Sequence, residues 1–498
     1  MKKAIVIGSG FSGLSTATFL AKQGWNVTVI EKHHIAGGRA RQLNDDGFTF
    51  DMGPSWYWMP DVFERYFQCF GKKRADYYSL KRLDPSYRVV WQDQALDIPA
   101  DYAELKKLFE IIEPGSAAKL DTYLQQAAYK YNVGIKKLVQ KPGQSWSEFI
   151  DWQLIKGIFK LEVFSSIKKL ISKNFKDPKL RQLLEFPVLF LGALPKDTPA
   201  LYSLMNFADI KGGTWYPEKG MYSIVDAMYK LAIELGVIFN FDENVTSIST
   251  HDNLATGIKS VTSESGIKAT KEYNADVIIA TADYHFVENE LLPQKLKSYS
   301  ESYWNKRVMA PGSLLYYIGL NKKLKNVTHH TLFFDVDFEK HGEEIYVSKE
   351  WPSNPLFYVC ASSVSDNSVA PEGCENLFFL IPIAAGLSDD TEERRNKYFE
   401  QIVARFEQHI GEKILESVIY KKTFGPVDFV NEYNAFKGNA YGLANTLLQT
   451  AVLKPSCRSK KVKNLFYAGQ LTVPGPGVPP SLISGQVVAR EVIKHFDS

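Results

Sequence analysis

Three glycines near the N-terminus, Gly8, Gly10 and Gly13, have the spacing of a loop that binds the phosphates of a dinucleotide. Residues 3–7 are apolar as in a buried strand and residues 14–23 have a helical pattern, so the loop joins a strand to a helix. Gly8 permits the sharp turn, Gly10 lets the backbone approach a pyrophosphate, and Gly13 permits close packing of the helix on the strand. The helix N-terminus then faces the phosphates.

An acidic residue, Glu31, completes this unit. It follows the next predicted strand, residues 27–30, about 20 residues beyond the glycines, where a carboxylate binds a ribose hydroxyl and disfavours a 2′-phosphate. The alternative is an ordinary glycine turn. Such a turn would not require a strand, a helix, a second strand and an acidic residue to follow one another at these spacings. The sequence therefore predicts a dinucleotide site, whose loop residues are Gly8, Ser9, Gly10, Phe11, Ser12 and Gly13.

The same unit serves NAD and FAD, and two further features favour FAD. Gly38 and Arg39 follow Glu31 after a short loop and would hold extended backbone and a positive charge against a pyrophosphate. Near the C-terminus, a predicted strand at 464–469 precedes a proline- and glycine-rich turn and a predicted helix at 481–495. The N-terminus of that helix would stabilise the N1/C2=O edge of a flavin, which becomes negative on reduction. A plain C-terminal helix after a rigid turn is the alternative for this second feature. No second glycine motif lies in a βαβ pattern, so we expect no built-in NAD(P)H site.

Composition excludes several classes of protein. The chain has 498 residues, and its 59 Lys and Arg exceed its 56 Asp and Glu by only three, so we expect no nucleic-acid partner. Its 4 cysteines have no metal-like spacing, which fits a reducing cytoplasm. The longest apolar stretch, residues 186–194, is far shorter than the roughly 20 residues of a membrane-spanning helix. We therefore expect a cytoplasmic protein that does not cross a membrane but can lie on one.

The order of the patterns predicts an α/β fold built from separated segments. We expect a Rossmann-type FAD-binding domain of residues 1–95, 211–290 and 431–498, and a discontinuous α+β substrate domain of residues 96–210 and 291–430 that is rich in helical periodicity. The later strands of the first domain are predicted at 238–249, 255–263, 266–273, 276–280 and 464–469.

Asp51 is the best candidate for a catalytic carboxylate. It ends a predicted strand and precedes a turn of Met52, Gly53 and Pro54 that would lie by the flavin ring. The alternative is a structural carboxylate that caps this turn.

Aromatic residues offer a second candidate feature. Trp56, Trp58, Trp215 and Tyr216 could line an apolar tunnel for a substrate, and core packing is an equal alternative for each.

Two adjacent histidine pairs, residues 33–34 and 329–330, do not have metal-ligand spacing. Neighbours on a strand point to opposite faces, so both members of a pair cannot bind one ion without distortion. We expect no metal. No set of nucleophile, base and orienting group indicates hydrolysis.

Residues 151–176 carry six lysines and two acids among apolar residues. Such a basic amphipathic helix could dip its apolar side into an anionic membrane. The alternative is a solvated helix whose apolar side covers the substrate domain.

Taken together, these motifs resemble those of the phytoene-desaturase-like flavoenzymes of carotenoid synthesis, whose FAD domain is like that of glutathione reductase and the amine oxidases. The resemblance covers nearly the whole chain, and it is carried by residues 8–13, 31, 37–40, 50–54, 83–88, 213–217, 329–330, 441–443, 464–469, 474–479 and 484–485. It implies non-covalent FAD, an acyclic carotenoid substrate and attachment to the cytoplasmic side of a membrane. It extends the expected FAD site to Lys32, Gly38, Arg39, Gly53, Pro54, Ser55, Val245, Gly469, Gln470, Gly477, Val478 and Pro479. The sequence departs from the common pattern at Lys219, Met221, Val473 and Gln470.

The resemblance implies desaturation. Oxidised flavin accepts a hydride at N5 from an allylic CH2, and a base or water removes a proton from the cation that spreads over the polyene. Within the family we favour a 1-hydroxycarotenoid 3,4-desaturase over a phytoene desaturase. An FAD amine oxidase and a non-enzymatic flavin or prenyl carrier are the alternatives outside it. The final electron acceptor would be oxygen or a membrane quinone.

Overall fold

A five-stranded parallel sheet carries the glycine-rich loop. A computed structural model describes residues 1–149, 161–162, 164–189, 192–264 and 267–497. In spatial order the strands are β19 (Leu465–Tyr467), β13 (Val277–Ala280), β1 (Lys3–Ile7), β2 (Asn26–Ile30) and β9 (Ile238–Asn240), and every neighbouring pair is parallel. The inner strands are apolar and buried, as expected where helices cover both faces of a sheet. The predicted Rossmann-type architecture is confirmed.

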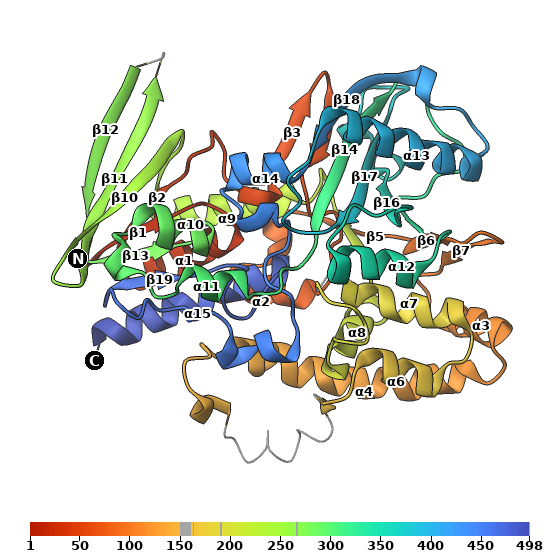
Figure 1. Ribbon diagram of the computed structural model, residues 1–498, viewed down its shortest axis with the longest axis horizontal. Helices are drawn as coiled ribbons and strands as arrows, with labels where there is room; N and C mark the ends of the chain where they lie inside the picture. The colour runs from red at the N-terminus through yellow and green to blue at the C-terminus, as the bar shows by residue number, and fades with distance from the viewer. Residues whose placement is uncertain (150–160, 163, 190–191, 265–266, 498) are drawn as a thin grey trace.

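Three helices pack around this sheet: α1 (Phe11–Lys22), α9 (Tyr222–Glu234) and α15 (Val478–Asp497). Helix α1 contacts both of the others, and α1 and α15 lie side by side in Figure 1. Helix α15 begins three residues before the predicted start at 481, because prolines are well tolerated in the first turn of a helix.

A three-stranded antiparallel sheet lies beside the parallel one and consists of β10 (Glu243–His251), β11 (Leu254–Glu264) and β12 (Ile267–Asn274). The prediction of one strand over 238–249 was wrong. Asp242 has a φ of 53°, so the chain turns there, and β9 stays in the parallel sheet while β10 pairs with β11.

A seven-stranded sheet forms the other half of the molecule (Figure 1). Its spatial order is β18 (Val418–Phe424), β14 (Gly312–Leu320), β17 (Glu375–Ile383), β16 (Phe357–Cys360), β15 (His330–Phe333), β6 (Tyr87–Val90) and β7 (Ala95–Ile98). Helical periodicity was expected in residues 291–430. The structure has five strands there, in addition to helices such as α12 (Phe338–Glu343) and α13 (Glu392–Ile410). β14 and β17 are almost continuously buried, and an uninterrupted apolar run does not distinguish strand from helix.

A helical layer lies below this sheet in Figure 1. It contains α3 (Tyr102–Ile112), α4 (Ser116–Lys136), α6 (Ile167–Asn174), α7 (Pro178–Leu189) and α8 (Leu204–Ile210). Shorter elements are α2 (Pro60–Gln68), α10 (Tyr284–Phe286), α11 (Glu301–Asn305), α14 (Pro426–Tyr433), β3 (Gln42–Asp45), β4 (Phe48–Asp51), β5 (Leu80–Arg82) and β8 (Trp215–Pro217).

Much of the basic stretch 151–176 lies outside the described residues. In its described part, α6 buries Ile167, Leu170 and Ile171, and Lys168 pairs with Glu339. This half of the stretch therefore turns its apolar side to the protein. Among the described residues, no helix is both long enough and apolar enough to span a membrane.

Candidate functional site

A cavity of about 390 Å³ opens at the carboxyl ends of β1, β2 and β13, the edge at which open α/β sheets bind ligands. Most of the predicted cofactor residues line it. They are Gly8, Ser9, Gly10, Phe11, Ser12, Glu31, Lys32, Gly38, Arg39, Gly53, Pro54, Ser55, Val245, Gly469, Gln470, Gly477, Val478 and Pro479. The sequence thus predicted residues from seven separate runs that the fold brings to one cavity.

The glycine-rich loop has the geometry that a pyrophosphate requires. A Cβ added to Gly10 would meet no protein atom within 4 Å, so this backbone faces open space at the start of α1. Gly13 does not line the cavity. A Cβ there would lie 2.1 Å from the Gly8 carbonyl oxygen, which agrees with a role in packing the helix on the strand.

Glu31 orders the loop as well as facing the cavity. Its Oε2 accepts hydrogen bonds from the backbone N and the hydroxyl of Ser9, at 2.8 and 2.7 Å, and its Oε1 accepts one from the His33 backbone N at 3.0 Å. A carboxylate has about four acceptor positions, so about one remains for a ribose hydroxyl.

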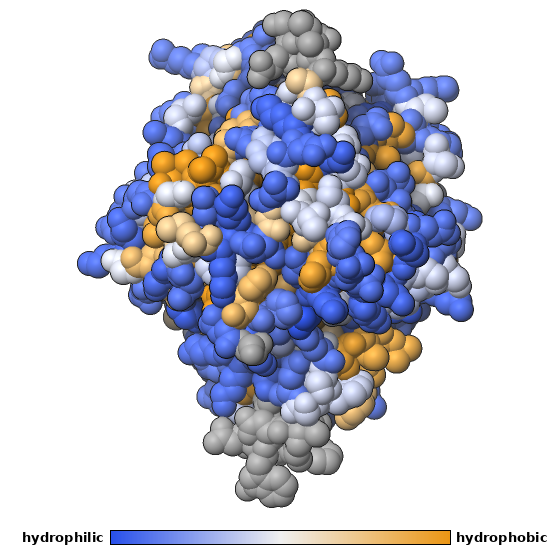
Figure 2. Space-filling model, turned by 90° about the vertical axis from the view of Figure 1, so that its left-hand side faces the viewer, coloured by the Kyte–Doolittle hydropathy of each residue, from blue (hydrophilic) through white to orange (hydrophobic). Residues whose placement is uncertain are grey.

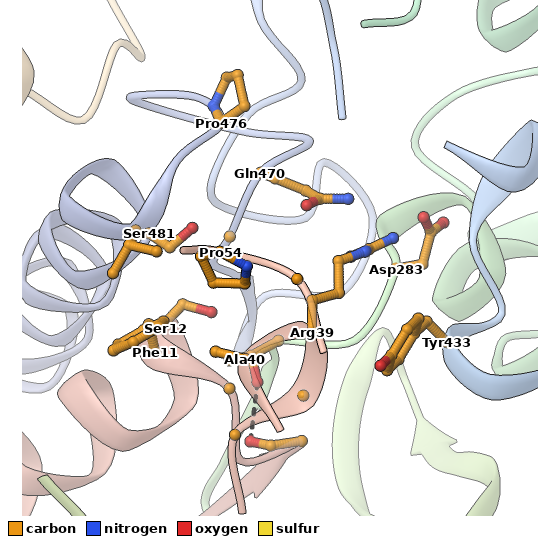
Figure 3. Close-up of a pocket in the computed structure, with 18 of the residues that line it drawn as sticks. Phe11, Ser12, Arg39, Ala40, Pro54, Asp283, Tyr433, Gln470, Pro476 and Ser481 are labelled. Carbon is orange, nitrogen blue, oxygen red and sulfur yellow. Dashed lines mark hydrogen bonds between the residues drawn. The ribbon is translucent and has the colours of Figure 1, made fainter. Parts of the chain in front are cut away.

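Arg39 supplies a buried positive charge (Figure 3). Its side chain extends toward Asp283 and Tyr433, its Nη2 donates to the Asn439 carbonyl at 3.3 Å, and its Nε has no hydrogen-bond partner among the described residues. Burial lowers the pKa of Arg39, and Asp283 opposes this shift. A buried cation with an open donor fits an anionic ligand, so these residues fit the pyrophosphate of a dinucleotide.

The C-terminal turn closes the cavity from the other side. Gly477 has a φ of 109° and leads directly into α15, whose first residues, Val478 and Pro479, line the cavity. The Gly469 backbone N donates to the Ser484 hydroxyl at 2.9 Å, which joins the end of β19 to α15. The helix N-terminus is thereby held at the cavity, as the flavin hypothesis requires.

The cavity continues from the dinucleotide residues to an apolar wall. Trp56, Trp58, Leu315 and Leu380 line this part together with Tyr358. The Ser55 hydroxyl donates to the Tyr358 hydroxyl at 3.0 Å. The wall therefore combines large apolar surfaces with two hydroxyl groups.

Trp215 and Tyr216 are not part of this wall. The Trp215 Nε1 donates to the Gly212 carbonyl at 2.9 Å, and the Tyr216 hydroxyl donates to Asp366 at 3.0 Å. Both side chains have hydrogen-bond partners within the protein, which favours the packing alternative for them.

Asp51 ends β4 as predicted but does not line the main cavity. Its carboxylate accepts hydrogen bonds from the backbone N atoms of Met221 and Tyr222, at 2.7 and 3.1 Å, at the start of α9. Burial raises the pKa of Asp51 to about 7. This arrangement favours the structural alternative, although the carboxylate holds α9 and not the turn at 52–54.

The strand argument against a shared site at residues 329–330 does not hold. Only His330 lies in β15, and the two imidazole rings have centroids 4.4 Å apart. Both lie close to Cys360 of β16. Nothing in the sequence indicated this pairing, because it depends on contact between two strands.

Some residues of the cavity were missed. Asp283 follows β13 at the carboxyl edge of the sheet, and the rule that ligands bind at this edge could have identified it. Tyr433 and Tyr358 come from α14 and β16, in a segment without a motif, and only the tertiary structure brings them to the site.

Comparisons with known proteins agree with this geometry. The family described as flavin containing amine oxidoreductase matches residues 11–493. The carotenoid 3,4-desaturase of Haloarcula japonica is 38% identical over 99% of this chain and 98% of its own. The zeta-carotene-forming phytoene desaturase of Myxococcus xanthus is 31% identical over 99% of this chain and 94% of its own. Among solved structures, a putative protoporphyrinogen oxidase from Exiguobacterium sp. 255-15 has a TM-score of 0.59 and 12% sequence identity, and the match covers 100% of this chain and 99% of the other. A putrescine oxidase variant has a TM-score of 0.60 and 13% sequence identity, and the match covers 99% of both chains.

Proposed function

Because the chain belongs to the flavin-containing amine oxidoreductase family, we propose that it is an FAD-dependent carotenoid desaturase, which removes two hydrogen atoms from a carbon–carbon single bond of an acyclic polyene. The observation that carries this proposal is the continuity of one cavity from the dinucleotide residues to the wall of Trp56, Trp58, Leu315 and Leu380. A polyene needs an apolar channel that ends beside the electron acceptor. The similarity to two desaturases over nearly their full length supports it.

The chain's own residues have separate tasks in this reaction. The loop at Gly8–Ser12 and the Arg39 guanidinium would hold the pyrophosphate, and Glu31 would hold the ribose. Bound FAD supplies the acceptor for a hydride from an allylic CH2. Trp56 and Trp58 exclude water from the polyene and orient it by their flat faces.

The substrate proposed is a polyene with a hydroxylated end, desaturated at the 3,4 bond. The greater identity to the 3,4-desaturase, 38% against 31%, supports this choice over phytoene. Ser55 and Tyr358 place hydroxyl groups in an otherwise apolar wall, where they could bond the hydroxyl of the substrate.

We also propose that the protein docks on the surface of a cytoplasmic membrane, where its substrate dissolves. Trp146, Phe164 and Leu448 are apolar but 64%, 83% and 76% exposed. A Cβ added to Gly143 would lie 3.1 Å from the Ala451 carbonyl oxygen, so the segments that carry Trp146 and Leu448 are neighbours. The side that carries β10–β12 is mainly hydrophilic with separate apolar patches (Figure 2) and would face water. Oxygen or a membrane quinone would then reoxidise the flavin.

The test uses FAD-loaded protein and liposomes that contain acyclic carotenoids with or without a 1-hydroxyl group, in air. We expect a product two hydrogens lighter with absorption at longer wavelength, formed faster from the hydroxylated polyene. Ser55→Ala should reduce this preference, and Ser172→Ala on the exposed side of α6 should not. If the polyenes stay unchanged and the protein oxidises soluble amines instead, the desaturase proposal is wrong and the protein is an amine oxidase.

A further inference from the structure

A second group of chemically active side chains lies behind the cavity wall. His330 and Cys360 are directly paired across the antiparallel strands β15 and β16, and His329 precedes β15 with its carbonyl bonded to the Ala361 backbone N at 2.9 Å. One nitrogen of each imidazole and the Cys360 sulfur lie within 4.8 Å of one another. All three residues are buried.

The histidines lack the partners that buried imidazoles normally have. Neither nitrogen of His329 has a hydrogen-bond partner in the described part of the chain, and the same is true of the Nε2 of His330. His329 is 5% exposed and His330 is 0% exposed, so water does not reach them from the surface. Buried polar groups without partners destabilise a fold, so a ligand is expected to compensate.

The second nitrogen of His330 is held as in a metal ligand. Its Nδ1 lies 2.6 Å from the Tyr358 hydroxyl, and its ring is stacked on Trp56 with centroids 4.2 Å apart. A histidine that binds a metal through one nitrogen is usually oriented by an oxygen at the other nitrogen. The ring of His330 is therefore fixed in place by two neighbours.

A small polar cavity adjoins the same group. It has a volume of about 20 Å³ and is lined by Asp51, Ser55, Tyr216, His329 and Cys360, with Ser362, Asn376 and two phenylalanines. This is room for one ion or one water, since a water needs about 10–15 Å³ by this measure. A divalent cation would be partly neutralised by the Cys360 thiolate, and the Asp51 carboxyl group lines the same small cavity.

We propose that His329, His330 and Cys360 bind one divalent metal ion of the zinc type, with a fourth position directed to the small cavity. Nitrogen and sulfur ligands together select such a borderline-soft ion, at about 2.0–2.1 Å for Zn–N and 2.3 Å for Zn–S. In a tetrahedral site these bond lengths place ligand atoms about 3.3–3.6 Å apart, so the three side chains must approach one another by roughly 1 Å to complete the site. Binding releases the thiol proton of Cys360 to solvent and changes no oxidation state.

The ion would fasten β15 to β16 behind the wall that Trp56 forms. Its role is structural, because none of His329, His330 and Cys360 lines the flavin cavity.

The experiment measures metal in the FAD-loaded protein, produced without a histidine tag. The protein is stripped with a chelator, incubated with one equivalent of Zn²⁺, desalted and analysed for zinc per chain, and X-ray absorption at the zinc edge reports the ligands. We expect about one zinc per chain with one sulfur at about 2.3 Å. Cys360→Ser and His329→Asn should each lower zinc affinity at least tenfold.

Two matched variants serve as controls. Cys457→Ser removes another buried cysteine, and His341→Asn removes another buried histidine whose Nε2 has no partner in the described residues. Both should keep one zinc per chain. A folded, flavin-loaded wild type that retains less than a tenth of an equivalent, or zinc without a sulfur ligand, would overturn the proposal whether or not the variants fold.

Discussion

At the scale of single residues, Gly10 and Gly13 of the dinucleotide unit separate ligand binding from packing. Gly13 lies against backbone, with 2.1 Å between an added Cβ and the Gly8 carbonyl oxygen, whereas Gly10 faces open cavity. Both belong to the same motif in the sequence. The structure gives them different tasks, and these tasks can be measured separately.

We predict opposite effects for alanine at these positions. Gly13→Ala should destabilise the FAD-free protein by about 1–3 kcal/mol, because α1 must move away from β1. Gly10→Ala should leave the melting temperature of the FAD-free protein unchanged but weaken FAD binding at least tenfold, since its methyl group occupies the space of the pyrophosphate. Calorimetry of stripped protein and fluorescence titration with FAD measure the two effects. A destabilised Gly10→Ala apoprotein, or one with normal FAD affinity, would show that the loop is used differently.

Residue-level prediction succeeded where the signal was local. Gly8 to Glu31 fall within one βαβ unit, and their types and spacing follow from the chemistry of a dinucleotide. Asp51 and Tyr216 were chosen as candidates, but each forms hydrogen bonds to residues about 150–170 positions away in the chain, which no local pattern shows. The proximity of His329 to Cys360 could not be predicted either, because it arises from strand pairing.

At the scale of elements, the turn before α15 depends on a buried amine. The Nζ of Lys454 donates to the Asn445 side chain at 3.1 Å, and a Cβ added to Gly475 would lie 3.0 Å from this Nζ. Burial lowers the pKa of Lys454 to about 7. The amine thus supports the turn in its neutral form.

This gives a pH dependence of stability. Between pH 7 and the ordinary lysine value of 10.5, the unfolded chain binds more protons than the folded protein, so the free energy of unfolding should rise with pH across this window. The rise should be on the order of 4 kcal/mol, and Lys454→Met should abolish it. Thermal denaturation at several pH values measures it, with the exposed Lys230→Met as control. Equal pH profiles for wild type and Lys454→Met would mean that the amine stays charged.

Element boundaries were predicted where a turn has a sequence signal and missed where it has none. Strands β1, β2, β13 and β19 were found, since each is a short apolar run with a clear end. The break between β9 and β10 depends on a single residue, Asp242, with a left-handed backbone conformation. The apolar runs of the strands in 291–430 cannot be distinguished from those of a buried helix. The domain boundaries stay a prediction, and the expected boundary after residue 95 falls within β7, which pairs with β6.

At the scale of the whole molecule, the fold joins two halves of different chemistry. The parallel sheet presents loops that bind charged phosphates, and the seven-stranded sheet contributes Leu315, Tyr358 and Leu380 to an apolar wall of the same cavity. A charged cofactor and a lipid-soluble substrate can therefore meet in one cavity.

The measurement that tests this account most directly is a single turnover without oxygen. FAD-loaded protein is mixed with liposomes that contain limiting amounts of 1-hydroxylated acyclic carotenoid, and flavin bleaching and new double bonds are counted together. We predict one flavin reduced by two electrons for each double bond formed. Double bonds without flavin bleaching, or a flavin that no polyene reduces, would contradict the central claim that the shared cavity brings the polyene to the cofactor.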